Sequence, residues 1–82
     1  MKETEELIKD QSYSITIVRH CLCERSHGLP KRFRSGETYR GRFEKTSMHK
    51  DYVCFYIDRI NDFVYFPTWS ISWEEYQEKQ GA

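Results

Sequence analysis

The feature that most constrains this chain is the period-two alternation of apolar residues across residues 51–66. Successive side chains of a strand point to opposite faces, so this pattern predicts extended segments with one buried side. Residues 59–62 interrupt the pattern with Asn and Asp, which favour a tight hairpin turn between strands at 51–58 and 63–66. The side expected to face the core carries Val53, Phe55, Ile57, Val64 and Phe66.

The composition favours strands over helices as the main elements. Aromatic residues make up 16% of the chain, whereas Ala occurs once and Leu three times. Packed helices draw heavily on Leu and Ala, while aromatic residues are enriched in strands, so this balance predicts a mainly β fold. At 82 residues the chain has room for a single domain with one core.

Further elements are expected on both sides of the hairpin. In chain order we expect a strand at 13–23, a long irregular loop at 24–36, a strand at 37–45, a polar turn at 46–50 and, after the hairpin, a short strand at 68–73. The long loop is predicted from Gly28, Pro30 and Gly36, which interrupt regular structure. These elements place a small barrel at residues 12–74, between an N-terminal extension at 1–11 and a tail at 75–82.

Two terminal segments also fit helical turns. Residues 3–9 fit one or two such turns, with Thr4 as N-cap and Leu7 and Ile8 as the apolar side. Residues 72–75 fit a capping box, so a helical turn through Tyr76 is the alternative to a strand there.

Two stretches resemble small SH3-like proteins encoded by phages and prophages. Residues 33–39, Phe-Arg-Ser-Gly-Glu-Thr-Tyr, are similar to the entry into one strand of these proteins, and residues 52–58 with 63–67 are similar to their hairpin. The resemblance covers roughly residues 15–73 and implies an SH3-like small five-stranded barrel. It implies no single activity, because fold and function separate readily. It suggests a phage or prophage accessory protein that binds and modulates or inhibits a bacterial host protein.

The sequence contains none of the familiar catalytic motifs. It has no Gly-rich phosphate loop, no nucleophile elbow and no His-Glu-x-x-His helix. We therefore expect a non-enzymatic protein that acts by binding, without a cofactor.

The three cysteines raise the question of a metal site. A zinc site made of Cys21, Cys23, His27 and one distant ligand is conceivable, because zinc accepts thiolate and imidazole. The spacing Cys-x-Cys differs from the usual zinc knuckle and places both thiols on one face of a strand. We favour Cys21 and Cys54 as small core residues and expect no metal.

Targeting signals are also missing from the sequence. An odd cysteine count without a signal peptide argues against a disulfide framework. No apolar run approaches the ~20 residues of a membrane span. We therefore expect a cytoplasmic location and no membrane partner.

Charge is unevenly distributed although the net charge is zero. Residues 19–50 hold nine Lys or Arg against three Asp or Glu. A basic stretch of this kind could meet an acidic protein surface, where Arg pairs with carboxylates, or could grip nucleic-acid phosphates with Phe33 or His27 stacking on bases. It could equally be a solvated loop that keeps an edge strand from pairing. The candidate contact residues are Arg25, Lys31, Arg32, Phe33, Arg34, Arg40 and Arg42.

The outer side of the predicted hairpin is unusually aromatic. A sheet face open to water is normally polar, so cover is expected over these rings. It could come from within the chain, through Leu7 and Ile8 or through Trp73 and Tyr76, or from a protein partner or a second copy in a homodimer. Trp69 and Trp73 could each be a core residue or a residue that anchors a binding partner. Four outward rings are Tyr52, Tyr56, Phe63 and Tyr65, and the candidate binding set takes Tyr52, Tyr56, Tyr65 and Trp69.

Overall fold

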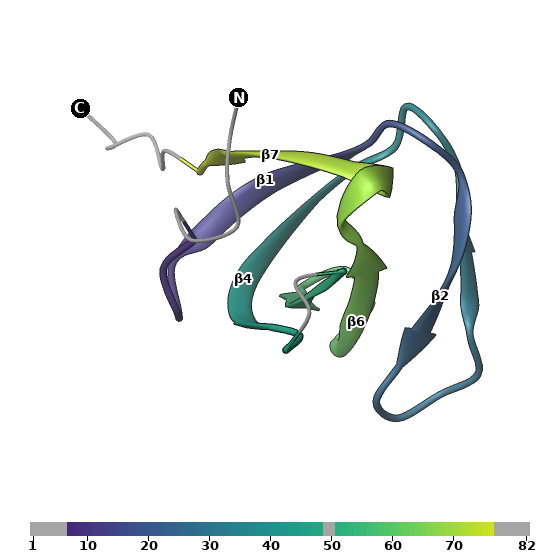
Figure 1. Ribbon diagram of the computed structural model, residues 1–82, viewed down its shortest axis with the longest axis horizontal. Helices are drawn as coiled ribbons and strands as arrows, with labels where there is room; N and C mark the ends of the chain where they lie inside the picture. The colour runs from purple at the N-terminus through teal and green to yellow at the C-terminus, as the bar shows by residue number, and fades with distance from the viewer. Residues whose placement is uncertain (1–6, 49–50, 77–82) are drawn as a thin grey trace.

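The computed structural model describes residues 7–48 and 51–76, and in these residues the chain forms one antiparallel sheet of seven strands that does not close into a barrel (Figure 1). No α-helix occurs among them, so the expected mainly β fold is confirmed. The elements are β1 (Ser12–Ile17), β2 (Cys21–Arg25), β3 (Lys31–Phe33), β4 (Thr38–Thr46), β5 (Tyr52–Ile57), β6 (Asp62–Pro67), the short 3-10 helix η2 (Thr68–Ser70) and β7 (Ile71–Glu75).

The strands lie in the order β3-β2-β6-β5-β4-β1-β7. Figure 1 shows them bent around a shared interior, with β1, β4 and β7 on one side and the β2–β3 hairpin on the other. The sheet therefore has an inner face, which is packed, and an outer face, which meets water. Within the described part of the chain, no helix has the length and hydrophobicity needed to cross a membrane.

The inner face holds the core that the alternation predicts. All five apolar residues expected on the buried side of the hairpin are buried, and Tyr39 and Phe43 of β4 are buried with them. Phe55 lies among other rings, with ring centroids 5.5 Å from Phe43, 6.0 Å from Tyr13 and 6.4 Å from Phe66. Edge-to-face pairs of this kind add about 0.5–1.5 kcal/mol each beyond the area that they bury.

The predicted hairpin is confirmed, with its turn shifted by one residue. β5 and β6 pair from Tyr52↔Pro67 to Ile57↔Asp62, so residues 58–61 form the connection. Asn61 adopts φ 64°, the left-handed conformation that Asn tolerates better than most residues, and its amide donates to the Ile57 carbonyl at 2.7 Å. Asp62 belongs to β6 and not to the turn.

One irregularity interrupts the pairing of β4 with β5. Phe43 pairs with Phe55, but the next pair joins Lys45 to Cys54, so Glu44 is the extra residue of a β-bulge. The bulge ends the strict alternation of β4 and turns Lys45 toward the outer face, opposite Cys54.

Two sequence-based strand boundaries were wrong in the first half of the chain. The strand expected at 13–23 is split, because the amides of Val18 and Arg19 donate to the Ser70 carbonyl and turn the chain between β1 and β2. The loop expected at 24–36 contains β3, which pairs with β2 through three residues. The described chain therefore has seven strands where five were expected.

The segment expected as a strand at 68–73 begins as a 3-10 helix. The buried Ser70 hydroxyl donates to the Pro67 carbonyl at 2.7 Å, which satisfies it within the turn. β7 then runs to Glu75 and pairs with β1, so the alternative of a helical turn through Tyr76 was wrong. Of the helical turns expected at 3–9, residues 3–6 lie outside the described residues.

The packing at Gly41 gives a test of the fold. A methyl group added there would lie 2.8 Å from Ile57 Cδ1, a fully buried atom, and 3.0 Å from the Tyr56 carbonyl oxygen. We expect Gly41→Ala to lower the free energy of unfolding in urea by about 1–3 kcal/mol, because neither neighbour can move freely. The matched control is Thr38→Ala, on the exposed side of the same strand, where no buried neighbour has to move. The control should cost less than about 1 kcal/mol, and equal losses would contradict this account.

Candidate functional site

Three cations from two segments, β3 with the residue that follows it and the β5–β6 turn, come together at one end of the inner face. We call Lys31, Arg34 and Arg59 the basic cluster. The Lys31 ammonium lies 5.4 Å from the Phe33 ring, and the Arg59 guanidinium lies 4.8 Å from the Tyr39 ring. These two rings touch each other edge to face at 5.4 Å. The cluster therefore sits on a buried aromatic pair that joins β3, β4 and the β5–β6 turn.

One carboxylate lies within the basic cluster. Glu37 Oε1 accepts hydrogen bonds from the Arg34 amide and from the Tyr39 hydroxyl, both at 3.0 Å. The backbone bond from Arg34 lowers the pKa of Glu37 most, followed by the bond from Tyr39, and the charges of Lys31 and Arg34 act in the same direction. Burial, and then Glu37 itself, raises the pKa of Tyr39, so its phenol keeps the proton that it donates.

The backbone between β3 and β4 fixes this arrangement. Gly36 adopts φ 98°, a conformation that other residues rarely take, and its amide donates to the Ile17 carbonyl at 2.7 Å. The Glu37 amide donates to the Arg34 carbonyl, which closes the turn and brings Glu37 back toward Arg34. The sequence motif Ser-Gly-Glu predicts a turn, but it carries no signal for the arrival of Arg59 from a distant hairpin.

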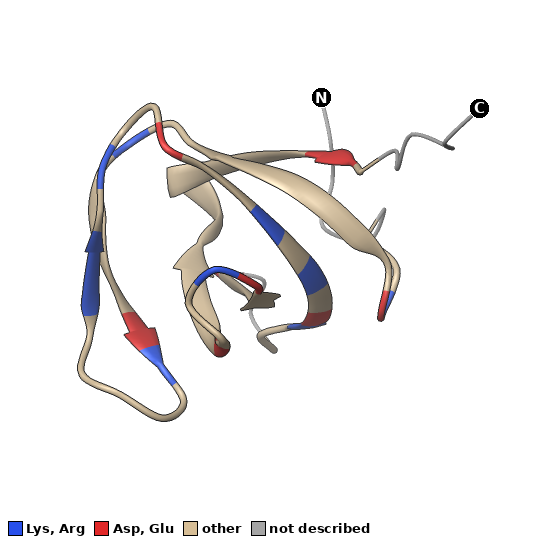
Figure 2. Cartoon of the chain, turned by 180° about the vertical axis from the view of Figure 1, so that it is seen from behind, with Lys and Arg blue, Asp and Glu red and all other residues tan. Residues whose placement is uncertain are grey.

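The other basic candidates lie on other parts of the sheet, and Figure 2 shows Lys and Arg spread over several strands and turns. Arg40 and Arg42 share the exposed side of β4, as expected from their spacing, but three strands separate β4 from β3 in the sheet. Arg40 stacks 4.4 Å from the Tyr76 ring and pairs with Asp58 at 3.6 Å. Arg32 is exposed on the edge strand β3. The basic stretch of the sequence is therefore divided among several surfaces.

Phe33 was wrongly predicted as a contact residue. It has 0% exposure and packs 5.0 Å from Phe66, so it belongs to the core and cannot stack on a ligand base. Because its sequence neighbours, Arg32 and Arg34, are charged, the local pattern did not indicate that Phe33 is the inward residue of a short strand.

Asp62 is a buried charged residue whose role the sequence does not reveal. Its side chain accepts from His27 Nδ1 at 2.9 Å, from the His27 amide at 3.0 Å and from Arg25 Nε at 3.3 Å. Arg25 therefore holds the β2–β3 connection onto β6 and is not free to bind a partner through this nitrogen. Burial of Asp62 opposes ionisation, but the bonds from His27 and from the Phe63 amide outweigh it and lower the pKa of Asp62 to about 2.

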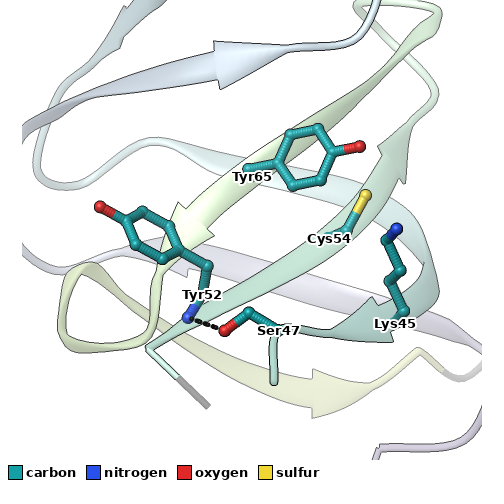
Figure 3. Close-up of a pocket in the computed structure, with 5 residues that line it drawn as sticks. All are labelled: Lys45, Ser47, Tyr52, Cys54 and Tyr65. Atoms are coloured by element: carbon teal, nitrogen blue, oxygen red, sulfur yellow. Dashed lines mark hydrogen bonds between the residues drawn. The ribbon is translucent and has the colours of Figure 1, made fainter. Parts of the chain in front are cut away.

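The outer face of the sheet carries a shallow hollow, which we call the aromatic trough (Figure 3). A cavity of about 190 Å³ opens there over Cys54. A second hollow of about 270 Å³ shares Lys45, Cys54 and Tyr65 with the first, so the two form one depression. The complete lining is Lys45, Ser47, Tyr52, Cys54 and Tyr65 for the first hollow, with Ser26, His27, Glu44 and Phe63 added by the second.

The chemistry of the aromatic trough favours binding over reaction. Cys54 is 3% exposed, and burial raises the pKa of its thiol to about 11, although a hydrogen bond with Tyr65 acts in the opposite direction. The thiol is therefore neutral at pH 7 and a weak nucleophile. Cys54 is buried, as expected, but it lies on the outer side of β5 and outside the inner core. Cys21, the other expected core residue, is only partly buried.

The outward rings are not covered by the terminal segments that we considered. Leu7 and Trp73 are part of the inner core, Ile8 is exposed, and Tyr76 stacks against Arg40. None of the four lines the aromatic trough. Tyr52 is 46% exposed and Trp69 on η2 is 57% exposed, which places both at the surface. Tyr56 packs edge to face on Phe63, with the ring centroids 5.1 Å apart. The Arg42 guanidinium lies over the Tyr56 ring, 5.1 Å from its centroid.

The conceivable zinc ligands do not gather in one place. His27 is directed to Asp62, while the thiols of Cys21 and Cys23 lie 2.9 Å apart on β2. Among the described residues, no three His, Cys, Asp or Glu side chains are arranged to hold a metal ion.

Comparison with known proteins gives no relative. No protein family model matches the chain, and neither a curated protein nor a solved structure shows significant similarity to it.

The hydrogen bonds of Asp62 predict how stability depends on pH. Because its pKa is lowered from 3.8 to about 2, the unfolded chain binds this proton more readily than the folded protein. The stabilisation is complete above pH 3.8 and is lost as the pH falls toward about 2. We expect Asp62→Asn to lower stability at pH 7 and to flatten this acid-side loss, as measured by urea unfolding across the range. His27→Ala keeps the backbone amides of residues 27 and 63 as donors to Asp62, so its stability should depend on pH to an intermediate degree. Parallel profiles for wild type and Asp62→Asn would refute the assignment.

Proposed function

We propose that this chain is a protein-binding module whose basic cluster contacts an acidic surface of a partner protein. The observation that carries the proposal is the meeting of Lys31, Arg34 and Arg59 on the Phe33–Tyr39 ring pair, with Glu37 beside Lys31 and Arg34 and bonded to Tyr39. Three positive charges against one negative charge leave a local excess of positive charge, although the net charge of the whole chain is zero. Such an excess attracts a complementary surface and speeds its approach.

Two cations of the basic cluster, Lys31 and Arg59, are held in position before any partner arrives. Lys31 and Arg59 rest against rings of the buried pair, and the backbone of Arg34 is fixed by Glu37. Side chains that are already ordered lose less conformational entropy on binding. The exposed guanidinium groups of Arg34 and Arg59 also suit the paired geometry of carboxylates.

We further propose that the fold is a variant of the SH3-like barrel. Five strands, β6-β5-β4-β1-β7, are consecutive in the sheet, and a 3-10 turn precedes the last strand. The β2–β3 hairpin then occupies the position of the long first loop. Together with the resemblance of residues 33–39 and 52–67 to phage and prophage proteins, this supports an accessory role in which the chain binds and modulates or inhibits a host protein.

Charge reversal within the basic cluster tests the main proposal. The double variant Arg34→Glu/Arg59→Glu should lose the proteins that the immobilised wild-type chain retains from a bacterial lysate. For one retained and purified partner, we expect the affinity to fall by about 100-fold, because like charges facing each other cost several kcal/mol. Titration calorimetry at fixed salt provides the measurement.

The matched control changes the net charge equally on other surfaces. Arg19→Glu/Arg32→Glu reverses two exposed residues outside the basic cluster and should keep the partner. Thermal melts should show that both variants are folded. If both double variants lose the partner equally, only net charge matters, and if neither loses it, the cluster is not the contact surface.

A second candidate function, binding of single-stranded nucleic acid, is favoured by one feature of the outer face. Arg42 stacks on Tyr56, which packs on Phe63, and Arg40 lies two residues away on the same side of β4. Partly exposed rings beside Arg groups form the kind of surface on which unpaired bases stack while phosphates meet the cations.

Oligonucleotide binding separates this candidate from the first. Fluorescence anisotropy with labelled oligo-dT and oligo-U should detect binding. The logarithm of the association constant should fall linearly with the logarithm of the salt concentration. Tyr56→Ala should weaken binding by about 1–3 kcal/mol, whereas Arg34→Glu/Arg59→Glu should weaken it less. Absence of binding at about 50 mM salt would remove nucleic acid as a partner.

A further inference from the structure

The thiols of Cys21 and Cys23 are in direct contact on the edge hairpin of the sheet. Their sulfur atoms lie 2.9 Å apart, and both side chains share the inner side of β2. Cys23 is fully buried, whereas Cys21 is partly exposed and so within reach of a small molecule in solution. Neither residue belongs to the basic cluster or to the aromatic trough.

We propose that Cys21 and Cys23 form a reversible disulfide within one chain when they meet a small-molecule disulfide such as oxidised glutathione. The two sulfur atoms already lie close together, so closure requires no movement of one element toward another. The inference does not depend on the proposed partner, because the bond forms between two residues of this chain alone.

The geometry of a strand makes this disulfide a strained one. Residues two apart in an antiparallel strand are separated by about 6.4–6.8 Å between Cα atoms, because each residue advances about 3.2–3.4 Å. Disulfides span about 4.4–6.8 Å between Cα atoms, so an extended β2 lies at the upper limit. Closing the bond therefore puckers β2 locally, and strained disulfides are the easily reduced ones that serve in switching.

The exchange proceeds in two balanced steps. The thiolate of the accessible Cys21 attacks one sulfur of oxidised glutathione, which forms a mixed disulfide and releases one glutathione thiolate. Burial, and then the contact with Cys21, raises the pKa of the Cys23 thiol, so Cys23 attacks the Cys21 sulfur as its proton passes to the departing glutathione sulfur, which leaves as the second glutathione molecule. Two protein thiols are oxidised, and one glutathione disulfide is reduced to two glutathione molecules.

The bond would act on the hairpin that carries part of the basic cluster. Cys21 pairs with Phe33 and Cys23 pairs with Lys31 across the β2–β3 ladder. The ladder contains three residue pairs, and β2 is joined to β6 by only two more. A pucker between Cys21 and Cys23 is therefore transmitted to the strand that positions Lys31 and Phe33.

Mass spectrometry of the purified full chain tests the proposal directly. The chain is equilibrated with graded mixtures of oxidised and reduced glutathione, quenched with acid, alkylated with N-ethylmaleimide in denaturant and digested with trypsin. Cleavage after Arg19 and Arg25 yields the peptide 20–25, which contains both thiols, while Cys54 falls in the separate peptide 51–59. We expect peptide 20–25 to lose two hydrogen atoms and to carry no alkyl group under oxidising mixtures. Excess reduced glutathione should restore two alkylation sites.

A variant separates the roles of the two thiols. Cys23→Ser should accumulate glutathione on Cys21, because the resolving thiol is missing, whereas Cys54→Ser should behave as wild type. The proposal is overturned if wild-type peptide 20–25 carries two alkyl groups in every mixture, or retains glutathione as its final product. It is also overturned if the peptide is found linked to peptide 51–59 or to a second copy of the chain.

Discussion

The ring of Phe55 is the contact on which the packing of this sheet depends. It lies at the centre of the inner face, fully buried, and meets rings from β1, β4 and β6. A chain of this length has little core, so a few large side chains must supply most of its buried apolar area. Because three strands direct a ring to the same point, their registers are fixed together. The exposed sides of the same strands are then free to carry charge and aromatic surface.

The β2–β3 hairpin is held to the rest of the sheet in a different way. Its link to β6 is a ladder of two residue pairs, so the polar contacts of Asp62 carry much of the attachment. A buried carboxylate is costly unless its oxygens are satisfied, and here four donors from Arg25, His27 and Phe63 satisfy them. Hydrophobic packing thus fixes five strands, whereas hydrogen bonds and Phe33 fix the remaining two.

Local patterning predicted the central hairpin and the inner faces of β5 and β6, because period-two alternation is a property of neighbouring residues. It failed for residues 24–36. There, charged residues flank the one inward ring of β3, and the glycines and the proline suggest an irregular loop. The divided basic stretch has a similar origin: Arg25 and Arg34 are nine residues apart, but one serves a buried carboxylate and the other the basic cluster. Arg59 joins that cluster through the turn of another hairpin, and no local signal marks such a contact.

The open sheet has a consequence for the behaviour of the protein at high concentration. An unclosed sheet presents unpaired backbone groups at its first and last strands, here β3 and β7, which are potential templates for further strands. β3 is three residues long and carries Lys31 and Arg32, while β7 ends in the exposed pair Glu74 and Glu75. A short ladder offers little cooperative gain, and like charges repel when two identical edges approach. The fold can thus remain unclosed without offering a long apolar seam for fibrous polymerisation.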